Sequence, residues 1–129
     1  MSASTKNKPA THTKVADYTD FAIRYLENEG YKILERTWVC DAGIVDIIAI
    51  DNDTLVFLEV RGRRTITTGF PEQSVTKAKR SRYEIIAAYY LSQTEQLSTR
   101  VRFDLLSVIL AGNNQAFLKH HKNAFGSDA

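Results

Sequence analysis

The chain has 129 residues, of which 43% are hydrophobic and 25% are charged, and its formal net charge is +2. This length and composition favour one soluble domain with a hydrophobic core of its own. The small net charge excludes a strong general attraction to nucleic acid or anionic lipid, so such binding would need a local basic patch. Cys40 is the only cysteine, which excludes an intrachain disulfide and a cysteine zinc cluster. No apolar run approaches the roughly 20 residues of a membrane span, and we expect a cytoplasmic protein.

The N-terminal residues 1–14, MSASTKNKPATHTK, are predicted to be a disordered basic lead-in, because they lack the apolar core of a secretory signal. Apolar residues then recur at helical spacing from Val15, and Gly30 stands where a helix C-cap glycine belongs. Residues 31–40, YKILERTWVC, have the composition of a strand. The predicted ordered part of the chain therefore begins with a helix and a strand.

Residues 46–60 contain two apolar runs, DIIAI and TLVFLEV, joined by a turn-forming stretch, and we expect a hairpin of two strands. After a polar loop, a second helix is predicted over 75–96, basic in its first half and apolar in its second. A strand is predicted over 101–110, and the short segment 116–120 is a candidate for a last strand.

The order of the predicted elements is α-β-β-β-α-β, which indicates an α/β fold with a mixed β-sheet flanked by helices. No repeat and no linker divides residues 15–125, so we expect a single domain there. Residues 126–129 are predicted to be a flexible C-terminal tail.

Each strand of the predicted hairpin carries one carboxylate, at Asp46 and at Glu59. Side chains alternate between the faces of a strand, so Asp46 shares a face with Ile44, and Glu59 shares one with Arg61. If the strands pair through the turn, the two carboxylates converge at the end of the hairpin away from that turn. Two carboxylates in an apolar sheet repel each other, so a cation is expected between them. Mg²⁺ meets this demand with oxygen ligands, and Arg61 meets it without a metal.

Several motifs, in this order and spacing, are similar to those of a known family. Asp46 followed by the triplet Glu59-Val60-Arg61 on the next strand resembles the PD-(D/E)-x-K site of metal-dependent nucleases. Together with AIRYLENEGYKILERTW, FPEQSVTKAKR and VRFDLLSV, it resembles the YraN-like family of small bacterial endonuclease-like proteins over residues 17–125. The resemblance implies a restriction-endonuclease-like fold and metal-dependent hydrolysis of phosphodiesters in nucleic acid.

Three charged positions of the family pattern are changed in this chain. The glutamate on its first helix falls on Thr19, the glutamate of its Gly-Glu-Ile-Asp motif falls on Ile44, and its lysine falls on Arg61. Arginine stays charged at neutral pH, so it cannot act as a general base, although it can stabilise charge on a phosphate. We therefore favour impaired or absent metal catalysis over an intact nuclease site.

The resemblance also implies roles for the positions that remain. Asp46, Glu59 and Arg61 are the candidate catalytic residues, and Asp46, Glu59 and the carbonyl of Val60 are the candidate ligands of Mg²⁺ or Mn²⁺. The same residues are equally compatible with a metal-free remnant that Arg61 neutralises.

Two basic stretches, RGRR and KAKRSR, flank the predicted site in the sequence. They are either solvated surface charges or a rim that contacts the phosphates of nucleic acid. Lys79 falls on a lysine of the family pattern and is a candidate to replace the missing lysine of the triplet. The six basic residues of the predicted rim are Arg63, Arg64, Lys77, Lys79, Arg80 and Arg82.

Other polar and aromatic residues are interpreted as structural. His120 matches a family position to which we assign a packing role, and Arg102 with Asp104 is expected to form an ion pair at a strand start. Tyr89 and Tyr90, with Phe103 on the following strand, are expected to serve core or helix–sheet packing rather than to be platforms for base stacking.

Three functions are compatible with the sequence. The first is a metal-dependent endonuclease acting on structured or single-stranded DNA or RNA. The second is a nuclease-fold module that binds nucleic acid without metal chemistry. The third is a protein-interaction subunit whose partner supplies the activity, and a homodimer is compatible with each of the three.

Overall fold

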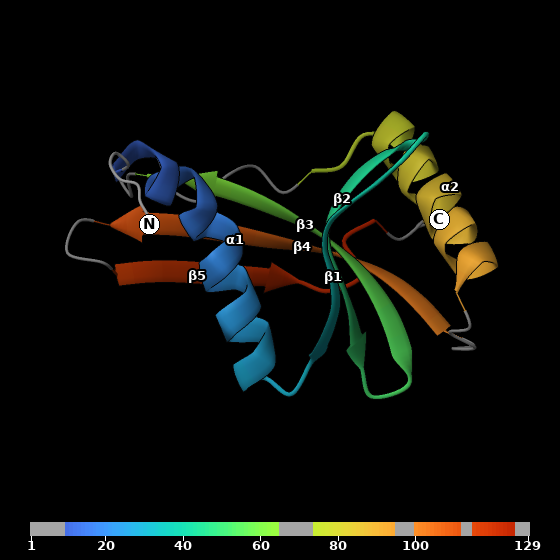
Figure 1. Cartoon of the computed structure of the whole chain (residues 1–129), viewed down its shortest axis with the longest axis horizontal. Helices are drawn as coiled ribbons and strands as arrows, with labels where there is room; N and C mark the ends of the chain where they lie inside the picture. The colour runs from blue at the N-terminus through green and yellow to red at the C-terminus, as the bar shows by residue number, and fades with distance from the viewer. Residues whose placement is uncertain (1–9, 65–73, 95–99, 112–114, 126–129) are drawn as a thin grey trace, which may run out of the picture.

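The structure is a computed structural model that describes residues 10–64, 74–94, 100–111 and 115–125 (Figure 1). Its five strands form one sheet in the order β1-β2-β3-β4-β5, in which β3 and β4 are parallel and the other neighbours are antiparallel. The predicted mixed sheet with flanking helices is confirmed, and it is compatible with a restriction-endonuclease-like fold. The candidate last strand is also present, as β5. The elements are α1 (Ala10–Asn28), β1 (Lys32–Cys40), β2 (Gly43–Asp51), β3 (Thr54–Arg63), α2 (Lys77–Gln93), β4 (Arg100–Ala111) and β5 (Gln115–His121).

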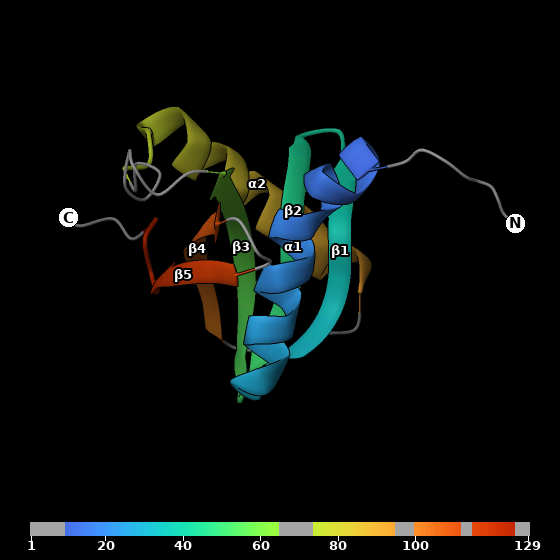
Figure 2. The same ribbon diagram turned by 90° about the vertical axis from the view of Figure 1, so that its left-hand side faces the viewer.

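The two helices cover opposite faces of the sheet (Figure 2). On one face, Leu26 of α1 packs in a buried cluster with Ile47 and Leu58. On the other face, Ile86 of α2 packs with Ile48 and Phe57. Because neighbouring residues of β2 and β3 face different helices, both strands are apolar on both sides, which explains their unbroken apolar runs.

The end of α1 is a glycine cap of the kind that the sequence predicts. Gly30 has a φ of +94°, its amide donates to the carbonyl of Glu27 at 3.0 Å, and the amide of Tyr31 donates to the carbonyl of Leu26 at 2.9 Å. These two bonds make a Schellman motif, which favours glycine at the left-handed position. The helix begins at Ala10, inside the segment 1–14 that was expected to be a disordered lead-in, while residues 1–9 and 126–129 lie outside the described part.

The second helix starts at a threonine cap and turns one face to the sheet. The side chain of Thr76 accepts from the amide of Lys79 at 3.1 Å. The buried residues of α2 are Tyr83, Ile86, Ala87 and Tyr90. Tyr90 is buried in the core, whereas Tyr89 lies about 100° round the helix and is 44% exposed. Tyr89 therefore lies outside the core, but its ring packs against that of Trp38 on β1, which agrees with the expected helix–sheet packing. Neither described helix is long and apolar enough to cross a membrane.

The β1–β2 hairpin continues beyond the part of β2 that pairs with β3. The β2–β3 pairs run from Asp51 with Thr54 to Ile47 with Leu58, whereas β1 and β2 remain paired as far as Gly43. The projecting end of the hairpin lies beside α2 (Figure 1). The candidate site lies between this projecting end of the hairpin and α2.

Candidate active site

Asp46 and Glu59 converge where β2 leaves β3. Ile47 and Leu58 form the last pair between the two strands, so Asp46 and Glu59 are the next residues outward. The amide of Val60 donates to Oδ2 of Asp46 at 2.7 Å, which bridges the two strands beyond their last pair. Glu59 is only 8% exposed. Strand alternation and the hairpin turn together bring these two carboxylates to one end of the sheet.

Two cations hold the carboxylate of Glu59. Nε of Arg61 donates to Oε2 at 2.9 Å, and Nζ of Lys79 donates to the same oxygen at 3.1 Å and lies 3.1 Å from Oε1. Arg61 also donates to the carbonyl of Ser74 at 3.0 Å, just before α2. Because Glu59 is nearly buried, these charge-assisted bonds offset the free-energy cost of removing it from water.

Asp46 has a less favourable environment than Glu59. Burial raises the pKa of Asp46 above its ordinary value, the hydrogen bond from the Val60 amide opposes this shift, and the negative charge of Glu59 adds to it. The positive charge of Lys79 lowers the pKa in turn, with the smallest effect. Asp46 therefore takes up a proton more readily than an exposed aspartate does.

The two carboxylates open onto a pocket of about 550 Å³ between the hairpin end and α2. Arg82 lies across Gly43, which has a φ of +147° and on which an added Cβ would come within 3.0 Å of Cδ of Arg82. Burial raises the pKa of Tyr83 well above its ordinary value, so its hydroxyl stays protonated and can donate. The pocket is lined by Ala42, Gly43, Ile44, Asp46, Glu59, Lys79, Arg82 and Tyr83.

In this arrangement the site does not fit a resident divalent ion. Mg²⁺ takes several oxygen ligands in octahedral geometry, and both oxygens of Glu59 lie against the ammonium group of Lys79. Ile44 provides no oxygen where the family pattern has a glutamate. Among the described residues there is no group of three or more His, Cys, Asp or Glu side chains suited to a metal.

The basic residues of the predicted rim lie in two parts of the structure, the first turns of α2 and the end of β3. Lys79 and Arg82 line the pocket, and Lys77 and Arg80 lie in the same first turns of α2. Arg63 ends β3, and Arg64 follows it. Sequence reasoning missed Tyr83 as a pocket residue, although its spacing of four from Lys79 puts both on one side of the helix.

Thr19, which stands where the family pattern has a glutamate on the first helix, lies away from the pocket. Thr19 belongs to α1, which packs on the opposite face of the sheet from α2. Its neighbour Tyr18 places its ring against Gly62 of β3, where an added Cβ would come within 2.3 Å of the ring. This part of α1 therefore packs against the strand that carries Glu59 and lines no part of the pocket described above.

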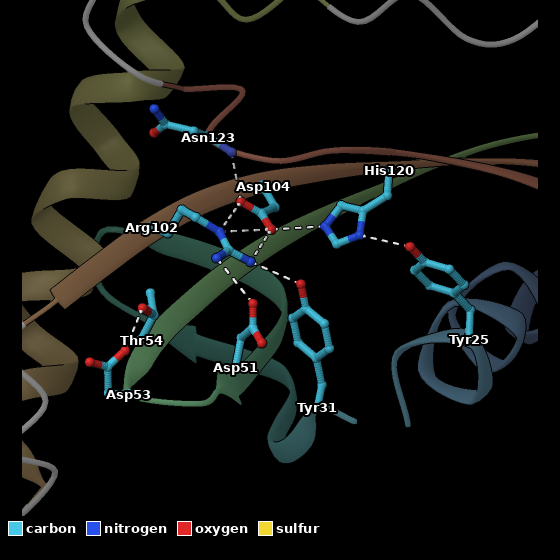
Figure 3. Close-up of polar contacts among 9 residues, drawn as sticks. All are labelled: Tyr25, Tyr31, Asp51, Asp53, Thr54, Arg102, Asp104, His120 and Asn123. Carbon is cyan, nitrogen blue, oxygen red and sulfur yellow. Dashed lines mark hydrogen bonds and ion pairs between the residues drawn. The ribbon is translucent and has the colours of Figure 1, made fainter. Parts of the chain in front are cut away.

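A second polar cluster surrounds Asp104, which is fully buried (Figure 3). Nε of Arg102 donates to Oδ1 at 2.9 Å, so the predicted ion pair is confirmed. Nε2 of His120 lies 2.8 Å from Oδ2, and the amide of Asn123 donates to Oδ1 at 2.9 Å. Burial alone would raise the pKa of Asp104, but its hydrogen bonds to His120, Arg102 and the Asn123 amide lower it below the ordinary value.

This cluster extends to β2, to α1 and to the segment between α1 and β1. Arg102 donates to Oδ2 of Asp51 at 3.1 Å and to the hydroxyl of Tyr31 at 2.9 Å. The hydroxyl of Tyr25 on α1 lies 3.0 Å from Nδ1 of His120. A neutral imidazole with its proton on Nε2 satisfies both neighbours of His120. These contacts agree with a structural role for His120.

Comparison with known proteins identifies one family. The model described as "Uncharacterised protein family UPF0102" matches residues 19–108. A UPF0102 protein of Persephonella marina is 41% identical over 109 residues, which cover 84% of this chain and 90% of the relative. Relatives from Rhodococcus opacus and Geobacter sulfurreducens are each 37% identical over 106 residues, which cover 82% of this chain and 90% and 83% of the respective relatives. The chain therefore belongs to the UPF0102 family, the YraN-like family whose motifs it carries.

Proposed function

We propose that this protein binds the sugar-phosphate backbone of DNA or RNA at the pocket between α2 and the β1–β2 hairpin. The observation that carries the proposal is the meeting of Lys79 and Arg82 with Asp46 and Glu59 in one open pocket. Basic side chains at a concave surface attract phosphates and release the counterions bound to them.

The internal pairing of Glu59 makes this binding electrostatically feasible. Two ionised carboxylates would repel a phosphate, but Arg61 and Lys79 neutralise Glu59. Asp46 accepts a hydrogen bond from the amide of Val60, which offsets part of its negative charge. Arg82 and the first turns of α2 then give the rim a net positive charge. Hydrolysis is expected to be weak, because Arg61 is not a base and Ile44 is not a ligand.

Binding is tested by fluorescence anisotropy with labelled DNA and RNA oligonucleotides between about 50 and 200 mM salt. We expect affinity to fall steeply with salt, and Arg82→Gln to weaken binding about tenfold, the equivalent of one charge-assisted contact. Arg24→Gln is the matched control, because Arg24 is an exposed arginine on α1. Affinity that does not depend on salt, or equal losses in both variants, would contradict the proposal.

A second candidate function is the Mg²⁺- or Mn²⁺-dependent endonuclease that the family resemblance implies. The observation that favours it is the convergence of Asp46 and Glu59 beside the amine of Lys79. Lys79 falls on a lysine of the family pattern and places its amine beside Glu59, so it is the candidate to replace the missing lysine of the triplet. Asp46, Glu59 and the Val60 carbonyl would be the ligands once Lys79 has moved away from Glu59.

The two candidates are separated by a cleavage assay with Mn²⁺. If the endonuclease candidate is right, the wild-type protein cuts nucleic acid and Glu59→Ala abolishes the activity. If the binding proposal is right, the wild type binds but hardly cuts, and the double variant Ile44→Glu with Arg61→Lys cuts measurably faster. No gain in the double variant would argue that the position is not a former hydrolase site.

A further inference from the structure

The outer side of α2 carries an apolar stripe that continues from the pocket. Arg82, which lines the pocket, is followed at helical spacing by Ile85 and Tyr89. These two side chains are 59% and 44% exposed, whereas the apolar side chains of a helix that packs on a sheet normally turn inward. With a rise of about 1.5 Å per residue, Tyr89 lies about 10 Å from Arg82 along the helix axis.

Aromatic side chains support Tyr89 from the hairpin side. Its ring centroid lies 6.1 Å from that of Trp38 on β1, with 47° between the planes. Trp38 in turn meets the buried Tyr90 edge-on, with centroids 5.1 Å apart. A ring that is already packed on one side loses little conformational freedom when a second planar group stacks on its exposed side.

The first turns of the same helix carry the positive charge that would attract a polyanion. Residues 77–82, KAKRSR, contain four basic side chains and no acidic one. Lys79 is engaged with Glu59, while Lys77 and Arg82 are exposed. An acidic partner that also offers flat apolar surfaces would match both the basic turns and the exposed rings.

We propose that unpaired bases of a single-stranded nucleic acid stack on Tyr89 while Arg82 and its basic neighbours contact the phosphates. This inference rests on the proposed function and narrows its substrate to single strands. Basic grooves with exposed aromatic rings hold single strands with little sequence preference, because every base has a flat face. In a duplex these faces are stacked on neighbouring pairs, so a duplex offers only its phosphates to the same surface.

The test compares three ligands of equal length, about 12 nucleotides. They are a thymidine oligonucleotide, the same sugar-phosphate chain without bases, and a blunt duplex. We expect the base-bearing single strand to bind roughly 5- to 150-fold more tightly than the baseless chain, the range for one stacked base. Trp38 is the only tryptophan and lies against Tyr89, so its fluorescence should be quenched by the base-bearing strand alone.

A pair of aromatic variants locates the stacking. Tyr89→Ala should lower the affinity for the thymidine oligonucleotide to the value for the baseless chain. The same variant should bind the baseless chain as the wild type does. Tyr89→Phe should keep most of the affinity for the thymidine oligonucleotide. Phe117→Ala is the matched control, because Phe117 is an aromatic residue 45% exposed on β5. Thermal unfolding of each variant verifies that it is folded.

The outcomes distinguish this inference from the function on which it rests. Equal affinity for the base-bearing and baseless chains, or an equally tight duplex, overturns stacking but leaves phosphate binding intact. Stacking on Tyr89 is also overturned if Tyr89→Ala loses no more affinity for the thymidine oligonucleotide than Phe117→Ala does. No binding of any of the three ligands contradicts the proposed function itself.

Discussion

Glu59 is the residue on which the chemistry of the pocket depends. A carboxylate that is 8% exposed needs strong partners to offset its removal from water, and Arg61 and Lys79 provide them from the same strand and from α2. The two side-chain cations occupy the space around Glu59 that a metal ion would need. Removal of one of them should therefore change the affinity of the site for metal.

Lys79→Met is expected to increase the affinity of the protein for Mn²⁺, because it frees Glu59 from the ammonium group and keeps a side chain of similar length. Isothermal titration of Mn²⁺ and Mg²⁺ into both proteins measures the change. Lys77→Met, on the same helix and exposed, is the matched control and should bind metal as the wild type does. Equal affinity in all three proteins would show that Lys79 does not compete with metal.

Asp46 is expected to make stability depend on pH in an unusual direction. Its pKa is raised in the folded state, so between the ordinary value of 3.8 and the folded pKa the folded protein binds more protons than the unfolded chain. Stability should therefore fall as the pH rises through this window and stay lower above it. Asp46→Asn keeps an oxygen for the Val60 amide and should remove this dependence, as measured by urea unfolding across pH.

The exposed Asp41→Asn provides the comparison, since it changes the same charge close by in the sequence. A pH profile of Asp46→Asn that coincides with those of the wild type and of Asp41→Asn would mean that Asp46 ionises normally in the folded protein.

At the scale of elements, the contact of α1 with β3 depends on a residue without a side chain. The ring of Tyr18 lies against Gly62, where even one methyl group would come within 2.3 Å of it. Tyr18 and Gly62 form a large-to-small pair between α1 and β3. The helix thereby reaches the strand that carries Glu59 and Arg61.

Gly62→Ala is expected to destabilise the protein by about 1–3 kcal/mol, the usual cost of overpacking. The double variant Tyr18→Ala with Gly62→Ala should recover part of this loss, because the smaller side chain makes room for the methyl group. Urea unfolding of the two single variants and the double variant gives the coupling free energy. If the losses of unfolding free energy in the two single variants add up to that of the double variant, Tyr18 and Gly62 are not in contact in solution.

For the molecule as a whole, the cluster around Asp104 joins parts of the sheet to α1. Asp104 on β4 binds Arg102 and His120, and through them the cluster reaches Asp51 at the end of β2 and Tyr25 on α1. A buried carboxylate with this many donors is costly to replace, since each donor would lose a charged acceptor.

Asp104→Asn is expected to lower the free energy of unfolding by roughly 3–5 kcal/mol at neutral pH, the usual loss when a buried ion pair is broken. The folded pKa of Asp104 is lowered, so its contribution is complete above 3.8 and is lost as the pH falls through the lower folded value. The difference in stability between wild type and variant should therefore shrink in acid. Urea unfolding near pH 7 and pH 3 checks this, and a difference that is constant with pH would contradict it.

The sequence by itself determined the order of the elements, the glycine end of α1 and the convergence of Asp46 and Glu59. These follow from local geometry: the helical period, the left-handed cap at Gly30 and the alternation of side chains along two strands joined by a tight turn. The tertiary structure alone decided that Lys79 pairs with Glu59 and that Tyr89 faces outward. Both depend on how α2 is rotated against the sheet, and that rotation is set by packing between segments far apart in the chain, which no local pattern encodes.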